Sequence, residues 1–223
     1  MFPDLTCDDI FQIETQRLWL RWPRSADAAA ITSFASLAEV AQLTAEIPHP
    51  YPKGEAERFI LKARADNASG AALNLAMTQK SGARRVIGVI SATPDTGAAI
   101  ELGYILAPPL WGKGFATEAI RALADTLFRL TMANRLTAAS RVHNAASRRV
   151  LEKAGFTFVD CGPDFLPARG GRHICDRFQL DRKTWAANQV AAGLSQAMPA
   201  MAQQTLAEFE EKASAASIEP FDI

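Results

Sequence analysis

A buried strand that runs through two glycines into a helix is the feature that most constrains this chain. Residues 102–107 are almost entirely apolar, Gly112 and Gly114 follow, and an amphipathic helical pattern begins after them. A helix that starts directly after such a turn presents unpaired backbone N–H groups, and the positive end of its dipole points the same way. The sequence therefore predicts an anion site at residues 112–117, of the kind that binds phosphate esters.

Two common phosphate-binding motifs can be tested against this turn, and neither fits. A dinucleotide-binding G-x-G-x-x-G/A motif beginning at Gly112 requires glycine or alanine where the chain has Thr117, and an acidic residue about 20 positions later, which the region of Leu136 does not supply. A P-loop requires serine or threonine after its Gly-Lys pair, and Lys113 is followed by Gly114. The two glycines could also form a plain turn between a strand and a helix.

The charges of the chain balance, because 24 lysines and arginines are matched by 24 aspartates and glutamates. Such a chain has no overall basic field of the kind that draws proteins onto nucleic acids or anionic membranes. We therefore expect no nucleic-acid or membrane partner, and any anion must be bound locally.

The cysteines and histidines form no recognisable chemical site. Three cysteines without C-x-x-C spacing favour a reducing compartment, so the cytoplasm is the expected location. With no signal peptide and no apolar run of about 18 residues, we expect a soluble, unprocessed protein without a bound metal. The residues expected to be structural are Cys7, Cys161, Cys175, His49, His143 and His173.

The apolar periodicity predicts one mixed domain rather than a doubly wound fold. Expected strands are 13–21, 73–79, 85–93, 99–107, 136–142, 156–161 and 173–180. Expected helices lie at about 27–43, 54–65, 114–131 and 145–154. This order predicts an α+β fold with a mixed, mostly antiparallel central sheet of about six to seven strands and flanking helices. The alanine-rich residues 186–223 are expected to be a helical or flexible extension, or an arm that binds a partner.

The turn at 111–119 also resembles a known motif. Its sequence, Trp-Gly-Lys-Gly-Phe-Ala-Thr-Glu-Ala, resembles the acyl-CoA motif Q/R-x-x-G-x-G/A of the GNAT superfamily of N-acetyltransferases, with Gly114 and Ala116 at the last two positions. Trp111 at the Gln/Arg position resembles the RimJ/RimL-type branch, which includes ribosomal-protein-alanine acetyltransferases. Further segments similar to that branch are 14–21, 101–104 and 144–156, and the resemblance covers about residues 10–185.

The resemblance implies the acyl-CoA N-acyltransferase fold and acetyl-CoA as cosubstrate. Small residues at the turn would let the CoA pyrophosphate approach the backbone amides, and the preceding strand would splay from its neighbour to bind the pantetheine arm. Asn144 occupies a position that bonds the CoA chain in the family; it could equally be a helix N-cap, and one side chain can serve both roles. The expected cofactor-binding residues are Ile105, Leu106, Ala107, Trp111, Gly112, Lys113, Gly114, Phe115, Ala116, Thr117 and Asn144.

The resemblance also implies direct attack of an amine on the thioester, without an acyl-enzyme. Glu101 is the candidate for receiving the amine proton, or else a structural or substrate-orienting carboxylate. Leu151 stands where many family members have a tyrosine acid, so Ser147 becomes the candidate for the departing thiolate; it could also be a first-turn serine bonded to the N-cap. A thiol with a pKa near 8.5 leaves without a strong acid. The basic residues Lys113, Arg148 and Arg149 could reach CoA phosphates or simply be solvated.

The acceptor side is the least constrained part of the sequence. By resemblance, loops 49–52 and 163–173 flank the amine, with Tyr51, Trp22 and Phe165 as candidate walls. The acceptor could be a protein N-terminus or a small-molecule amine, and the protein a monomer or a homodimer. A non-catalytic acyl-CoA sensor with the same fold is the main alternative, and a nucleotide-binding regulator is a remote one.

Overall fold

The computed structural model describes residues 2–81 and 84–190. The described residues up to Arg182 form one compact unit, and residues 183–190 belong to a second. Residues 183–190 are helical. The rest of the expected extension, from residue 191 to 223, lies outside the described residues.

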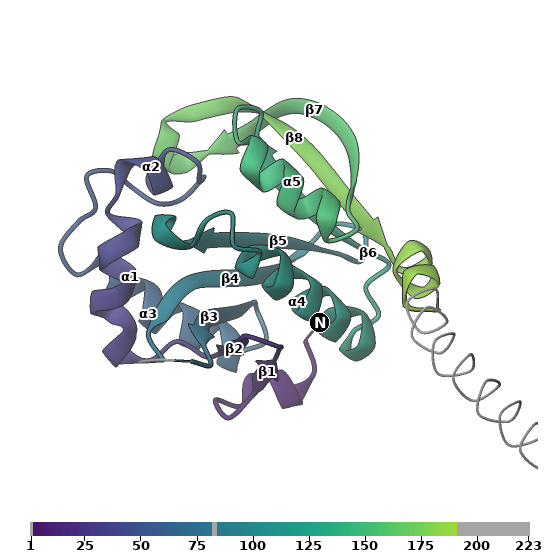
Figure 1. Cartoon of the computed structure of the whole chain (residues 1–223), viewed down its shortest axis with the longest axis horizontal. Coiled ribbons are helices and arrows are strands. Elements are labelled where there is room, and N and C mark those ends of the chain that lie inside the picture. The colour runs from purple at the N-terminus through teal and green to yellow at the C-terminus, as the bar shows by residue number, and fades with distance from the viewer. Residues whose placement is uncertain (1, 82–83, 191–223) are drawn as a thin grey trace, which may run out of the picture. The chain divides into compact units, whose positions relative to one another are not determined.

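The first unit is built on a mixed sheet of eight strands, one or two more than the sequence predicts (Figure 1). The strand order is β1-β2-β3-β4-β5-β6-β8-β7, and β5 pairs with β6 in parallel while the other neighbours are antiparallel. The expected α+β class with a mostly antiparallel sheet is confirmed. The strands are β1 (Gln12–Glu14), β2 (Leu18–Arg21), β3 (Leu73–Gln79), β4 (Val86–Asp95), β5 (Ala99–Leu106), β6 (Arg135–Arg141), β7 (Thr157–Leu166) and β8 (Gly171–Asp181).

The extra strand arises because the expected first strand, 13–21, is a hairpin made of β1 and β2. Thr15 forms the turn: its backbone N–H donates to the Leu18 carbonyl at 3.0 Å, and its hydroxyl accepts from the Leu18 N–H at 2.8 Å. The expected alternation is nevertheless correct within β2, where Leu18 and Leu20 are fully buried. The residue pattern alone did not reveal this turn, because Thr15 and Gln16 suit a strand as well as a loop.

The expected helix at 27–43 is broken into α1 (Ala28–Ala35) and α2 (Ala38–Ala41), because Leu37 adopts an extended conformation. In one continuous helix Val40 would point away from Ile31, since nine residues at 100° each amount to half a turn. The break allows both side chains to be buried. The remaining helices are α3 (Glu55–Ala68), α4 (Phe115–Leu130) and α5 (Ala145–Lys153).

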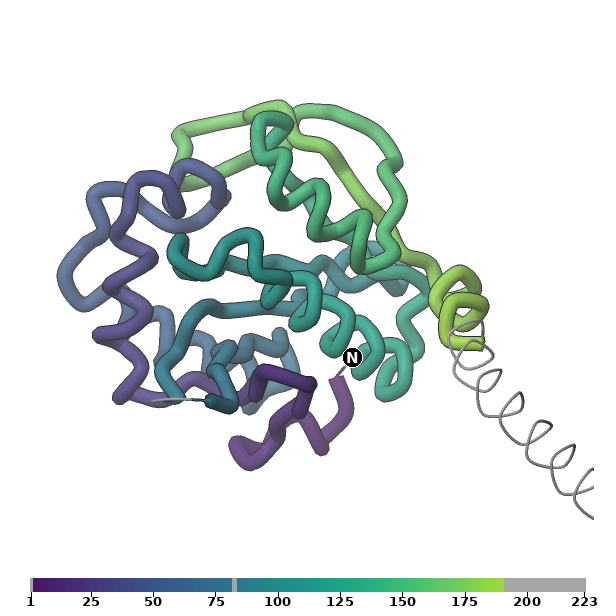
Figure 2. The backbone as a smooth tube through the Cα atoms, viewed as in Figure 1, coloured from purple at the N-terminus to yellow at the C-terminus, as the bar shows by residue number. Residues whose placement is uncertain are grey.

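Helices cover the sheet on both faces. Helices α1 and α3 pack against β3 and β4 over a core that includes Ile31, Phe34, Ile60 and Val89. Helix α4 packs against β1, β2 and β5, and α5 packs against β6 and β7, with α4 and α5 side by side (Figure 2). Because successive side chains of β5 point to opposite faces of the sheet, they alternate between the face covered by α1 and α3 and the face covered by α4 and α5.

Candidate active site

The neighbouring strands β5 and β6 are paired over a short distance. Their register joins three residue pairs, Ala99 with Arg135, Ile100 with Leu136, and Glu101 with Thr137. Beyond Glu101 the two strands separate, as the resemblance implies, while β6 continues beside β8. A cleft of about 1750 Å³ lies along this opening. Because single small-molecule pockets are roughly 300–1,000 Å³, the cleft has room for a long ligand and a second substrate.

The glycine turn lies at one end of the cleft. Gly112 and Gly114 have φ angles of 75° and 80°, in the left-handed region that favours glycine, and α4 begins directly afterwards at Phe115. A Cβ added at Gly112 would meet nothing within 4 Å. The start of this sixteen-residue helix therefore presents backbone amides and open space to the cleft.

Arg17, in the turn between β1 and β2, clamps the glycine turn. Its Nη1 donates to the Lys113 carbonyl at 2.9 Å, its Nε donates to Glu118 at 2.6 Å, and its guanidinium lies 4.3 Å from the centre of the Phe115 ring. Partial burial would raise the pKa of Glu118, but hydrogen bonds from Thr15 and Arg17 outweigh it and hold that pKa below its usual range. The hairpin thus fixes the geometry of the glycine turn.

Trp111 has a structural role at the end of β5. Its indole Nε1 donates to the carbonyl oxygen of Leu106 at 2.7 Å. The side chain is 38% exposed and also lines the cleft. Trp111 therefore ties the opened strand to the turn that follows it.

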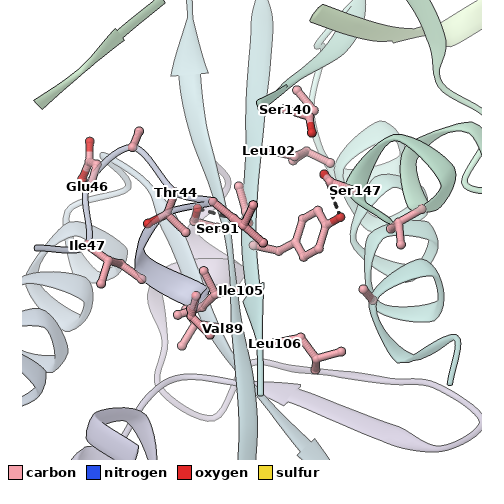
Figure 3. A pocket seen from close by; sticks show the side chains of 18 of the residues that line it. Thr44, Glu46, Ile47, Val89, Ser91, Leu102, Ile105, Leu106, Ser140 and Ser147 are labelled. Carbon is pink, nitrogen blue, oxygen red and sulfur yellow. Dashed lines mark hydrogen bonds between the residues drawn. The ribbon is translucent and has the colours of Figure 1, made fainter. Parts of the chain in front are cut away.

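A polar group formed by three side chains lies where α5 begins. Asn144 is the N-cap of α5 and accepts from the Ser147 backbone N–H at 3.1 Å. The Tyr104 hydroxyl donates to Ser147 Oγ at 3.0 Å, as the dashed line in Figure 3 shows. Burial raises the pKa of Tyr104 to about 12, although its hydrogen bond to Ser147 lowers it in part. All three residues line the cleft.

Glu101 lies at the point where the strands separate. It is accessible to solvent, yet desolvation by the surrounding protein raises its pKa, and the negative charges of Asp95, Asp164 and Glu46 raise it further. Glu101 is paired with Thr93 on β4. A carboxylate with a raised pKa in a cleft is a stronger base than an ordinary carboxylate, which makes Glu101 a candidate proton acceptor.

Residues 42–47 bridge the far side of the cleft. Arg141 Nη1 donates to the Gln42 carbonyl at 3.2 Å, the Ala168 N–H donates to the Ala45 carbonyl at 2.9 Å, and Arg169 donates to the Ile47 carbonyl. Thr44, Glu46 and Ile47 lie on one side of the strands in Figure 3, and Ser147 lies on the other. This segment connects the α1–α3 side of the molecule to β6 and to the β7–β8 turn.

Comparison with known proteins decides the family. The model of the acetyltransferase (GNAT) domain matches residues 17–157. This chain belongs to the GNAT acetyltransferase family. Its curated relatives include a probable N-acetyltransferase of Bacillus subtilis, YjcK, which is 39% identical over 75 residues (32% of this chain and 41% of the relative). Another is a putative ribosomal N-acetyltransferase of the same organism, YdaF, 33% identical over 85 residues (38% of this chain, 46% of the relative). The aligned segments thus span less than half of these relatives.

Solved structures share the GNAT fold at low sequence identity. A putative ribosomal-protein-serine acetyltransferase from Vibrio cholerae has a TM-score of 0.67 at 21% identity, covering 81% of this chain and 99% of the other. Mycobacterium smegmatis RimJ, in complex with CoA-disulfide, has a TM-score of 0.68 at 22% identity, covering 86% and 98%. The expected acyl-CoA N-acyltransferase fold is confirmed.

Most residues expected to form the GNAT site meet in the cleft. The expected residues that line it are Glu101, Ser147, Ile105, Leu106, Trp111, Gly112, Gly114, Phe115, Ala116, Thr117, Asn144 and Tyr51. Burial, followed by the charge of Glu55, raises the pKa of Tyr51 to about 12. Sequence reasoning did not identify Arg17 or Tyr104, although both lie within segments that resemble the family.

Three residues expected in the GNAT site, Ala107, Lys113 and Trp22, do not line the cleft. The Ala107 N–H donates to the Ile87 carbonyl at 2.8 Å, so this amide is already used, and Lys113 does not line the cleft. Trp22 is 4% exposed and lies under the guanidinium of Arg64, in a separate shallow pocket. The expectation that Trp22 forms a wall beside the acceptor is therefore wrong.

The basic residues also separate into two groups. Arg149 lines the cleft, whereas Arg148 pairs with Glu152 and Asp176.

Within residues 2–81 and 84–190, no group of three or more His, Cys, Asp or Glu side chains could hold a metal ion. None of the helices described is long and apolar enough to span a membrane.

Proposed function

We propose that this chain is an acetyl-CoA-dependent N-acetyltransferase that acetylates a primary amine by direct attack in a ternary complex. One observation carries the proposal: β5 opens beside β6 directly after Glu101 and leads, through residues 107–111, to the glycine turn before α4. The five residues of β5 after Glu101 span roughly 17 Å of extended strand, which suits a pantetheine arm. Family membership and CoA-bound neighbours of the same fold support this reading.

The turn would hold the diphosphate of CoA through backbone amides at residues 114–117, which line the cleft. The open space beside Gly112 and the helix dipole of α4 favour such an anion. Along the opened strand, β4 pairs with Ile105 and Leu106 on one side, and within the described residues no strand pairs with them on the other side, where the Leu106 carbonyl accepts from Trp111. When bound, acetyl-CoA supplies an acetyl group activated as a thioester.

Glu101 would take the proton of the attacking amine, directly or through one water molecule. Its raised pKa makes it a stronger base than an ordinary carboxylate. Ser147, beyond the opened strand at the start of α5, would place its hydroxyl at the departing sulfur. A thiol of ordinary pKa near 8.5 needs little further help to leave.

The acceptor is a primary amine, either a protein N-terminus or a small molecule. Relatives described as ribosomal N-acetyltransferases favour the protein N-terminus. Tyr51 and residues 44–47 would flank this amine, because they line the cleft. Thr44, Glu46 and Ile47 lie across the strands from Ser147 in Figure 3.

A two-part experiment tests the proposal. Calorimetry with acetyl-CoA measures binding, and release of free thiol with a panel of amines, including peptides with free N-termini, measures transfer. Glu101→Gln should lower turnover at least tenfold and change acetyl-CoA affinity less than twofold, while Glu39→Gln, at an exposed position of α2, should change neither. Binding without transfer to any amine would support the acyl-CoA sensor instead, and absence of binding would contradict both.

A further inference from the structure

The contact between Tyr104 and Ser147 is not explained by the acid and base roles alone. Tyr104 lies on the opened part of β5 and Ser147 in the first turn of α5, and their oxygens are 3.0 Å apart inside the cleft. Leu151, where the family often has a tyrosine, is 1% exposed and belongs to the core. A tyrosine therefore reaches the start of α5 from a different element.

When Tyr104 is the donor in this hydrogen bond, the serine proton is left unused. The Tyr104 hydroxyl donates to Ser147 Oγ, and the Ser147 backbone N–H is engaged by Asn144. A serine hydroxyl has one proton and two acceptor lone pairs. Within the described residues, the Ser147 hydroxyl has no second hydrogen-bond partner. Its own proton is therefore free to point into the cleft.

The phenol of Tyr104 is poorly suited to give up its proton. Burial raises its pKa to about 12, well above the ordinary thiol pKa of about 8.5. Net transfer of the phenolic proton to a thiolate is uphill by more than three orders of magnitude in the equilibrium constant. Tyr104 consequently acts as a fixed donor and not as a source of protons.

We propose that Tyr104 is a positioning residue that orients the Ser147 hydroxyl, so that the Ser147 O–H donates a hydrogen bond to the thiolate of departing CoA. This inference rests on the proposed acetyltransferase function. During transfer the bond between the amine nitrogen and the acetyl carbon forms, the carbon–sulfur bond breaks, and Glu101 takes the amine proton. The electron pair stays on sulfur, where Ser147 stabilises it until the thiolate takes a proton from water.

The test is the thiol pKa of CoA bound to the protein, measured by the ultraviolet absorbance of the thiolate during a pH titration. Tyr104→Phe and Ser147→Ala should each raise this pKa by about one unit, a tenfold loss of thiolate at a given pH, because a hydrogen bond to an anion is lost or misdirected. The double variant should match Ser147→Ala alone, since Tyr104 acts through Ser147. Ser33→Ala, which removes an exposed serine hydroxyl of α1 outside the cleft, is the matched control and should leave the bound thiol pKa unchanged.

A second variant keeps the test informative if Tyr104→Phe does not fold. The chain has two tyrosines, so 3-fluorotyrosine introduced into the Tyr51→Phe protein labels position 104 alone. The fluorinated phenol keeps the hydroxyl and is a stronger donor, so it should lower the bound thiol pKa, opposite to the effect of phenylalanine. If Tyr104 had only a structural role, fluorination and replacement by phenylalanine would not shift the bound thiol pKa in opposite directions.

Steady-state kinetics distinguish an effect on turnover from an effect on acetyl-CoA binding. Tyr104→Phe should lower kcat about tenfold with the KM for acetyl-CoA nearly unchanged. An unaltered thiol pKa in both Tyr104→Phe and the fluorinated protein would overturn the positioning role. Absence of CoA binding to the unmodified protein would overturn the proposed function itself, so the two failures are distinguishable.

Discussion

Arg17 and Glu118 are 101 positions apart in the chain, yet Arg17 Nε and Glu118 Oε2 are separated by 2.6 Å. The pair joins the turn of the first hairpin to the first turn of α4. Because Arg17 also bonds the Lys113 carbonyl, the same side chain holds both sides of the glycine turn. The anion site is therefore shaped by two segments that are remote in sequence.

Glu118→Gln should lower stability in a pH-dependent way. The folded pKa of Glu118 is held below its usual value, so ionised Glu118 stabilises the fold above the unfolded pKa of about 4.3, and this stabilisation is lost as pH falls through the folded pKa. We expect a loss of about 1 kcal/mol at pH 7, after allowance for solvent screening, and almost none near pH 3. Urea unfolding at both pH values measures it. Glu152→Gln, in an exposed pair with Arg148, should cost less than about 0.5 kcal/mol.

Gly112→Ala and Gly170→Ala form a matched pair for the anion site. Both glycines have φ of 75°, and an added Cβ would meet nothing within 4 Å at either. Each variant should lose about 1 kcal/mol of stability, because alanine is strained at this φ. Only Gly112→Ala should weaken CoA binding, by about tenfold in calorimetry, since its methyl group would occupy the space of the diphosphate. Equal CoA affinity in the two variants would mean that the turn is structural.

Asp95→Asn should move the acid limb of the activity profile to lower pH. After desolvation, the negative charge of Asp95 is the largest cause of the raised pKa of Glu101, so removing that charge lowers the pKa. Glu101 would then be ionised, and able to accept a proton, at lower pH. The measurement is kcat/KM for the amine against pH. Substitution with asparagine preserves the Oδ1 that accepts from the Thr96 N–H, and a limb that does not move would exclude Glu101 as the titrating base.

Trp111→Phe should loosen the end of β5. The variant keeps an aromatic ring but removes the indole donor from the Leu106 carbonyl, at a cost of about 1 kcal/mol in the free energy of unfolding. Hydrogen exchange should become faster at residues 105–107 and remain unchanged in α3. Trp19→Phe is the control, because the Trp19 ring packs under Lys80, outside the cleft. Equal exchange at 105–107 in both variants would show that the indole bond is unimportant.

The sequence predicted those turns and helices whose conformation depends mainly on residues that are neighbours in the chain. The glycine turn and α4 follow from glycine conformations and helical periodicity, and Asn144 is the N-cap that its residue type favours. The break at Leu37 was missed because it depends on burying Val40 together with Ile31, which is a tertiary requirement.

Site residues that are consecutive in the sequence could be predicted, whereas contacts between distant segments could not. Residues of the strand and turn meet in the cleft because they are consecutive. Tyr104 and Arg17 were missed because their partners, Ser147 and Glu118, come from distant segments. Trp22 was misplaced for the same reason, since the sequence does not indicate that Arg64 covers it.

The short pairing between β5 and β6 also bears on how the protein avoids self-association. A strand edge with free N–H and C=O groups normally invites pairing with another chain and hence aggregation. Here two such edges face each other within one molecule, and residues 42–47 bridge the opening between its two sides. The fold thereby keeps a strip of hydrogen-bonding backbone available to a slender ligand and withholds it from a neighbouring protein molecule.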